Sequence, residues 1–199
     1  DGEVVGIAVA VEGWSGYFPI AHEGGGNMDR ALVLDWFEDV LHTTATKIFH
    51  NAMYDVSWIR SLGFYINGGI IDTMIAASLI DENRFSYTLD SVGKDYIGMR
   101  KNEKLLQDAA KDFGVNPKAE MWRLPAPFVG EYAEKDAEIT LRLWRAVQHE
   151  ITKQDVWNIF NLETQLFPCL VDMKFKGVRK KKQKAMSVKH ELINTEKGL

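Results

Sequence analysis

Two short segments of this 199-residue chain place a carboxylate four residues after a polar side chain. One runs from Asn51 to Asp55, and the other, far along the chain, runs from Tyr132 to Asp136. On a helix, residues i and i+4 share a face, so Tyr132 and Asp136 can point at one site. A magnesium site for phosphodiester cleavage requires carboxylate ligands from different segments, supported by nearby polar side chains. These two segments provide both.

The segment around Asn51 is predicted to lie where a strand meets a helix. A strand over residues 46–50 leads straight into Asn51, and a helix over residues 52–62 puts Asp55 in its first or second turn. Functional groups gather at such junctions in α/β folds. The alternative is structural: Asn51 caps the helix, and Asp55 is a first-turn acid that complements the helix dipole.

The second segment lies in a predicted helix over residues 127–151. Asp136 falls on neighbouring ridges of this helix with Val129, Thr140 and Leu143, so it lies nearer the apolar stripe than Glu134 does. An aspartate that faces inward is costly unless a cation or a strong set of hydrogen bonds satisfies it. The alternative is a surface acid in a charged helix.

Hydrophobic patterning predicts short strands early in the chain and helices later. Asn27 is expected to cap the first helix, and Asp72 is expected to cap the helix over residues 73–80. Strands are predicted over 4–11, 17–20, 46–50 and 69–71, and further helices over 87–96, 104–113 and 155–176. This order predicts an α/β domain in which helices pack over a mixed sheet.

Composition limits the class of protein. The apolar fraction of 46% and the aromatic fraction of 11% suffice for a core, which argues against disorder. No apolar run approaches the ~18 residues that a bilayer span needs. The single cysteine, Cys169, excludes an intrachain disulfide and a cysteine-based zinc site; we expect a small buried thiol in a reducing, intracellular setting.

Charge is unevenly distributed. The net charge is −4, yet residues 174–184 hold seven of the 24 basic residues and no acid. The remainder has 17 basic against 28 acidic residues, or −11. An acidic body repels phosphates unless bound cations reverse the local field. The basic stretch could serve nucleic acid, or it could be a solvated linker.

Taken together, these motifs resemble the 3′–5′ proofreading exonuclease domain of family A DNA polymerases, of a phage-like kind. That domain belongs to the DEDD superfamily, in the subgroup with tyrosine in its last motif. The resemblance covers nearly the whole chain. It rests on His50–Asp55, Tyr132–Ala137, Ile71–Met74 with Ser86–Ser91, Phe18–His22, and Leu162–Val178.

The resemblance implies a ribonuclease H-like mixed sheet with flanking helices, truncated at its N-terminus. It implies an exonuclease-like domain over 1–153, followed over 154–199 by a helix and basic tail leading toward an absent polymerase region. The implied partners are the 3′ end of single-stranded DNA and the polymerase domain of the parent protein, with no membrane. The implied setting is the cytoplasm of a bacterial or phage-infected cell.

The resemblance also implies roles for the site residues. Two divalent ions, Mg²⁺ or Mn²⁺, about 4 Å apart would activate water and stabilise the leaving 3′ oxygen. Asp136 would ligate the first ion, and Asp55 would act through the second ion or its waters. Tyr132 would orient the attacking water, and Asn51 would support the site from the substrate side.

The chain departs from the family in two places. The first motif, Asp-x-Glu, is expected upstream of the opening strand. Asp1-Gly2-Glu3 matches this motif in residue types, but its position indicates a turn that precedes a strand. We therefore expect the chain as given to bind metal weakly and to cleave little. The basic run 179–182 also replaces the apolar residue and aspartate that usually follow Gly-Val, and no polymerase motif follows.

Two other functions stay open. One is a catalytically silent domain that binds single-stranded DNA or braces a polymerase, chiefly by base stacking and basic contacts. The other is a ribonuclease that acts on RNA 3′ ends with the same fold and metals. The six tryptophans are expected to be packing residues, with Trp122, beside Pro125 and Pro127, the one candidate for a substrate contact.

Overall fold

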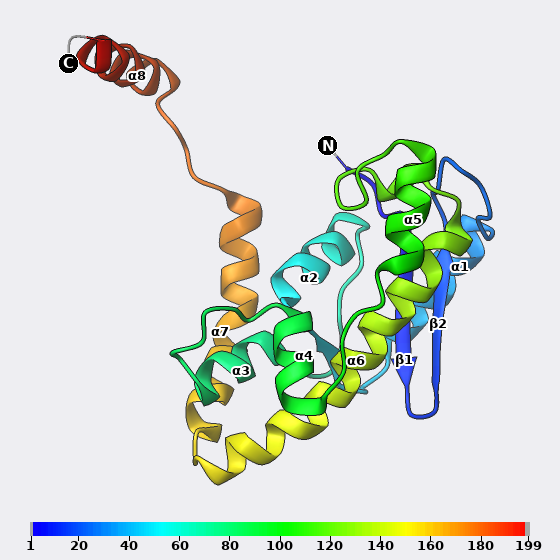
Figure 1. The fold of residues 1–199 in the computed structure, drawn as a ribbon. Coiled ribbons are helices and arrows are strands. Elements are labelled where there is room, and N and C mark those ends of the chain that lie inside the picture. Colours follow the sequence, from blue (N-terminus) through cyan, green and yellow to red (C-terminus); the bar gives the residue numbers. More distant parts are fainter. Residues whose placement is uncertain (1, 198–199) are drawn as a thin grey trace.

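The computed structural model describes residues 2–197 (Figure 1). Strands come early and helices dominate afterwards, as the patterning predicts. In chain order the elements are β1 (Gly6–Val11), β2 (Trp14–Pro19), α1 (Arg30–His42), β3 (Lys47–Phe49), α2 (Ala52–Ser61), β4 (Ile70–Asp72), α3 (Thr73–Ile80), α4 (Leu89–Ile97), α5 (Lys104–Phe113), the 3₁₀ turn η1 (Met121–Arg123), α6 (Ala126–Lys153), α7 (Trp157–Lys176) and α8 (Lys182–Lys197).

The strands form two pairs rather than one wide sheet. β1 and β2 are antiparallel, with Val11 opposite Trp14 across a tight turn in which Gly13 has a φ of 76°. Glycine adopts this left-handed conformation without steric cost, which is why such turns favour it. β3 and β4 are parallel, with Phe49 opposite Asp72, and the helix α2 connects them.

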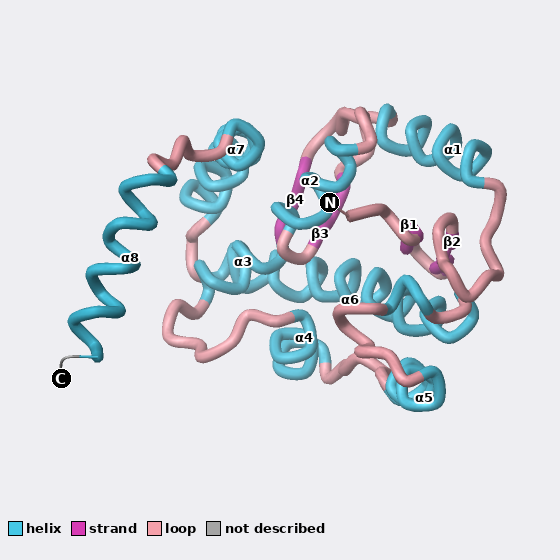
Figure 2. Tube along the Cα trace, turned by 90° about the horizontal axis from the view of Figure 1, so that it is seen from above, coloured by secondary structure: helices cyan, strands magenta, loops and turns pink. Residues whose placement is uncertain are grey.

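Helix α6 is the element on which most of the others pack. It crosses the middle of the body, with β1, β2 and β3 on one side and α4 and α5 on the other (Figure 2). Ile139, Leu143, Val147 and Ile151 recur at helical spacing and are fully buried. Gly93 of α4 lies so close that a Cβ there would stand 3.0 Å from Ile139.

Asp72 joins the two strand-to-helix junctions. Its carboxylate accepts a hydrogen bond from the Met74 N–H at 2.9 Å, which is the predicted cap of α3. The same carboxylate accepts the N–H groups of Asn51 at 2.9 Å and Ala52 at 2.8 Å, at the start of α2. One buried aspartate thus satisfies the backbone donors of two helices and fixes their relative position.

Three local expectations are wrong. The cap of α1 is Asp29, whose side chain accepts from the N–H of Leu32, whereas Asn27 instead hydrogen-bonds the backbone of His22. Cys169 is exposed, because it lies on the outer face of α7. Trp14 is also exposed; it is the first residue of β2, next to the turn of the hairpin.

Helices α7 and α8 keep much apolar surface exposed. On α7 the buried positions are Phe160, Phe167 and Val171, which pack against the body. Six large apolar side chains of α7 are exposed: Ile159, Leu162, Leu166, Leu170, Met173 and Phe175. Part of the predicted basic tail is helical, because α8 begins at Lys182, and this helix extends away from the body (Figure 1). Among residues 2–197 no helix is long and apolar enough to cross a membrane.

The packing of α6 predicts an unequal response to truncation of two leucines. Leu143→Ala should lower the free energy of unfolding by about 3 kcal/mol, because it removes a fully buried side chain and leaves a cavity. Leu162→Ala is the matched control: that side chain is 58% exposed on α7, so its loss should cost less than about 0.5 kcal/mol. Urea denaturation measures both, and equal losses would contradict this packing.

The double role of Asp72 predicts a larger loss than an ordinary cap gives. Asp72→Ala leaves three backbone N–H groups without their acceptor and should cost about 2–4 kcal/mol. Asp29→Ala removes one exposed capping bond and should cost about 1 kcal/mol. Thermal and urea unfolding of the two variants compare them directly. A loss at Asp72 no greater than that at Asp29 would refute its role at both junctions.

Candidate active site

Helix α6 brings Tyr132 and Asp136 to one face, one turn apart, as their spacing predicts. The side chain of Lys101 connects them. Its ammonium nitrogen Nζ donates to Asp136 Oδ2 at 2.6 Å and to the Tyr132 hydroxyl at 3.2 Å. The same nitrogen lies 5.1 Å from the centre of the Tyr132 ring, within range of a cation–π interaction. These three residues form the centre of the candidate site.

Asp136 faces partly inward. Its side chain is 26% exposed, while Thr140 and Leu143 on the same side of α6 are buried. Burial raises the pKa of Asp136, and the hydrogen bond and charge of Lys101 oppose that rise. The second carboxylate oxygen, Oδ1, is buried and accepts no hydrogen bond from any residue in the described part of the chain. Half of this carboxylate is therefore satisfied and half is not.

Lys101 lies in the loop between α4 and α5. The backbone N–H of Lys101 donates to Asp90 Oδ1 at 3.1 Å, which ties the loop to α4. Burial would lower the pKa of Lys101, but the hydrogen bond and charge of Asp136 outweigh it and raise this pKa. Burial, followed by the charge of Asp136, raises the pKa of Tyr132, so the phenol keeps its proton.

Asn51 and Asp55 lie at the β3–α2 junction. Asn51 has a left-handed backbone, with φ of 65°, which asparagine tolerates better than most residues. Its exposed side chain makes no capping bond, so the structural alternative, in which this side chain caps α2, is wrong. Asp55 is half-buried on α2; burial, together with the charge of Asp72, raises the pKa of Asp55 to about 6. Such a shift is common for carboxylates in functional sites.

The two halves do not form a ready-made metal centre: across residues 2–197, no three acidic, histidine or cysteine side chains group as a metal site. The halves are neighbours through other residues. Strand β3, which ends just before His50, packs on α6. Burial, and to a smaller extent the charge of Lys101, lower the pKa of His50. The ring nitrogen Nδ1 of His50 forms a hydrogen bond with the Thr73 hydroxyl at 2.9 Å.

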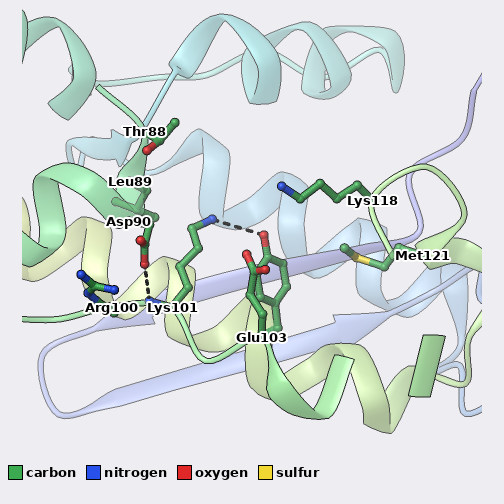
Figure 3. A pocket seen from close by; sticks show the side chains of 9 residues that line it. Thr88, Leu89, Asp90, Arg100, Lys101, Glu103, Lys118 and Met121 are labelled. Carbon is green, nitrogen blue, oxygen red and sulfur yellow. Dashed lines mark hydrogen bonds between the residues drawn. The ribbon is translucent and has the colours of Figure 1, made fainter. Parts of the chain in front are cut away.

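A cavity of about 670 Å³ opens beside Tyr132. Figure 3 shows Lys101 reaching across it to the tyrosine hydroxyl, with Glu103 alongside. The cavity is lined by three basic side chains, those of Arg100, Lys101 and Lys118, and by two acidic ones, those of Asp90 and Glu103. The full lining comprises Thr88, Leu89, Asp90, Arg100, Lys101, Glu103, Lys118, Met121 and Tyr132. Its size is typical of small-ligand sites, and its basic side chains suit phosphate groups.

Sequence reasoning missed Lys101, Arg100 and Lys118. No motif marks them, because each stands in or beside a loop and its position depends on how α4 and α5 pack on α6. The one available signal was local: a cluster of basic residues just after Gly98 within an otherwise acidic body. Trp122 is exposed, as expected, next to Met121 of the cavity.

The donor set fits a divalent cation at Asp136. Carboxylate oxygens are the ligands that Mg²⁺ and Mn²⁺ prefer, and Oδ1 is an acceptor that lacks a partner among the described residues. Asp55 lies on α2 and could contribute a second carboxylate. The phenol of Tyr132 lies close to Asp136, because Lys101 Nζ contacts both; a phenol can donate its proton to a water or to another oxygen.

The fold resembles solved nucleases. A structure described as the apo form of the nuclease matches with a TM-score of 0.62 at 16% identity, covering 83% of this chain and 72% of that one. Brucella melitensis NrnC matches with a TM-score of 0.60 at 18% identity, covering 83% and 73%. These likenesses support the α/β, ribonuclease H-like fold class that the sequence predicts.

Sequence comparison identifies the family. A DNA-directed DNA polymerase of Pseudomonas phage M6 is 37% identical over 185 residues, and DNA polymerase DpoZ of Salmonella phage PMBT28 is 30% identical over 181. The matches cover 88% and 87% of this chain but only 27% and 28% of the relatives. A family model described as 3′–5′ exonuclease, of the DNA polymerase A type, matches residues 15–152. The chain therefore belongs to the 3′–5′ exonuclease family of family A DNA polymerases.

Proposed function

We propose that this chain supplies the site at which a larger DNA polymerase removes nucleotides from the 3′ end of single-stranded DNA, as its proofreading unit. The observation that carries the proposal is the pairing of Tyr132 and Asp136 on α6, at the edge of a cavity with three basic side chains. The phage relatives are DNA polymerases, which supports DNA as the substrate and a polymerase region as the partner.

The proposed chemistry assigns each residue a separate task. Divalent ions, when bound, would activate water and stabilise charge on the leaving oxygen. Asp136 would hold such an ion through Oδ1, and Asp55 would add a second carboxylate from α2. The phenol of Tyr132 would orient the attacking water, because its proton is retained and its oxygen is already held. Asn51, with a side chain free of any capping bond, would contact the substrate strand.

The cavity would hold the terminal nucleotides. Its basic side chains can neutralise phosphates, which an acidic body would otherwise repel. Arg100 and Lys118 are exposed, so their heads can reach a bound strand without breaking a buried contact. Trp122, exposed beside the cavity residue Met121, offers a surface on which a base can stack.

Substitution at the site should separate catalysis from folding. Asp136→Asn should lower the rate of nucleotide release by at least about 100-fold, and Tyr132→Phe by about tenfold, because one removes an ion ligand and the other an orienting hydroxyl. The assay follows a labelled single strand in Mn²⁺, with the natural polypeptide that carries this chain. Asp55→Asn should fall between the two.

The matched control is Glu131→Gln, an exposed acid next to Tyr132 that accepts a hydrogen bond from Asn102 and does not line the cavity. It should change the rate by less than about twofold. Nucleotide release that survives Asp136→Asn would refute the proposal. Binding of single-stranded DNA without any cleavage in Mn²⁺ would instead favour a silent binding domain.

The cavity assignment predicts a change in the salt dependence of binding. Arg100→Ala with Lys118→Ala should weaken binding of a single-stranded oligonucleotide and reduce the slope of log affinity against log salt by about 1.4, since each phosphate contact on a single strand contributes about 0.7. Fluorescence anisotropy over several salt concentrations measures it. Lys111→Ala, exposed on α5 outside the cavity, should leave the slope unchanged.

A further inference from the structure

The ammonium group of Lys101 occupies the place at Asp136 where a cation is needed. It lies 2.6 Å from Oδ2, and the Lys101 and Asp136 side chains are only 18% and 26% exposed. A hydrogen bond between charged groups that are largely shielded from water is among the stronger side-chain contacts. The pair thus stabilises a carboxylate that would be costly to leave bare on the inner face of α6.

A divalent ion at Asp136 would meet this ammonium directly. Both cations seek the same carboxylate, and like charges a few ångströms apart repel strongly where water is scarce. Oδ1 alone offers one unoccupied acceptor, and it is attached to the group whose other oxygen Lys101 already holds. Binding of a divalent ion and retention of the Lys101 contact therefore oppose one another.

We propose that Lys101 is an internal counter-ion which holds Asp136 and Tyr132 in position before metal binds and which a divalent ion must displace from Asp136. The inference rests on the proposed function, because it takes Asp136 as a metal ligand. Its consequence is a site whose metal affinity is lower than its carboxylates alone would give.

The surroundings of Lys101 provide for its release. The backbone of the loop is held to Asp90, so the long side chain can move while the loop stays in place. Lys101 also lines the cavity with Arg100 and Lys118. A displaced ammonium would turn into this cavity, where the phosphates of a bound strand would receive it. Metal and nucleic acid would then favour one another's binding, since such coupling is reciprocal.

The test measures Mn²⁺ affinity without nucleic acid, by the electron paramagnetic resonance signal of the free ion. Lys101→Gln should bind Mn²⁺ about fivefold more tightly than the wild-type chain, because the competing charge is gone. Lys101→Arg keeps the charge and should stay within about twofold of the wild type. Lys118→Gln is the matched control: it lines the same cavity without contacting Asp136, and should also stay within about twofold.

The outcomes separate this inference from the proposed function. If Asp136→Asn abolishes Mn²⁺ binding while Lys101→Gln binds no more tightly than wild type, the counter-ion role is wrong and the metal site stands. If Asp136→Asn leaves Mn²⁺ binding unchanged, both fail. An equal gain in Lys118→Gln would reduce the effect to overall charge and overturn the specific role of Lys101.

A measurement on the unmodified chain does not depend on how the variants fold. Acetylation of Lys101 by a mild reagent, followed by mass spectrometry, reports how free its ammonium is. Saturating Mg²⁺ should increase the labelling rate at Lys101 relative to Lys118, because the ion releases it from Asp136. A rate at Lys101 that stays constant or falls would overturn the inference.

Discussion

The position of one carboxylate on a nearly buried helix constrains the whole site. Helix α6 buries Ile139, Leu143, Val147 and Ile151 against its neighbours, so its orientation is fixed by hydrophobic packing. Asp136 comes one turn before this buried run and cannot turn fully to solvent without rotating the helix out of its core. Partial burial of this charge is unfavourable unless nearby groups bind the carboxylate. Lys101 binds only one of its two oxygens.

A second aspartate organises the other half of the site in a different way. Asp72 is buried and fully engaged, since its oxygens accept three backbone N–H groups from the starts of α2 and α3. This contact positions α2 and therefore Asp55, whose pKa is raised by burial and, to a smaller extent, by the charge of Asp72. Asp72 is thus a structural residue, whereas Asp136 is left half-satisfied beside a cavity. The two acids differ in their hydrogen bonding: both oxygens of Asp72 accept backbone N–H groups, whereas only one oxygen of Asp136 has a partner among the described residues.

Much of the architecture could be predicted from the sequence because local chemistry determines it. The bounds of α3 and α5 follow from capping and apolar spacing, and the shared face of Tyr132 and Asp136 follows from helical periodicity alone. The contact of Lys101 with both of them could not be predicted, because it depends on the path of a loop between two packed helices. The burial of α7 could not be predicted for a related reason: apolar residues occur on two sides of this helix, and its sequence does not show which side faces the body. The second role of Asp72 also required the parallel pairing of β3 and β4, which no local pattern specifies.

The half-satisfied state of Asp136 argues for function more strongly than its motif does. A surface acid on a charged helix would be hydrated at both oxygens, and a structural acid would be bonded at both, as Asp72 is. Asp136 is neither: Oδ2 is held by an ammonium that could be displaced, and Oδ1 is buried with no donor in the described region. A folded protein tolerates such an arrangement only if the pairing at Oδ2 covers most of the cost, or if another ligand completes the shell. Lys101, which stabilises the Asp136 carboxylate, also lines the cavity. Its ammonium group is therefore well placed to move from Asp136 into the cavity when a cation binds the carboxylate and a phosphate enters the cavity.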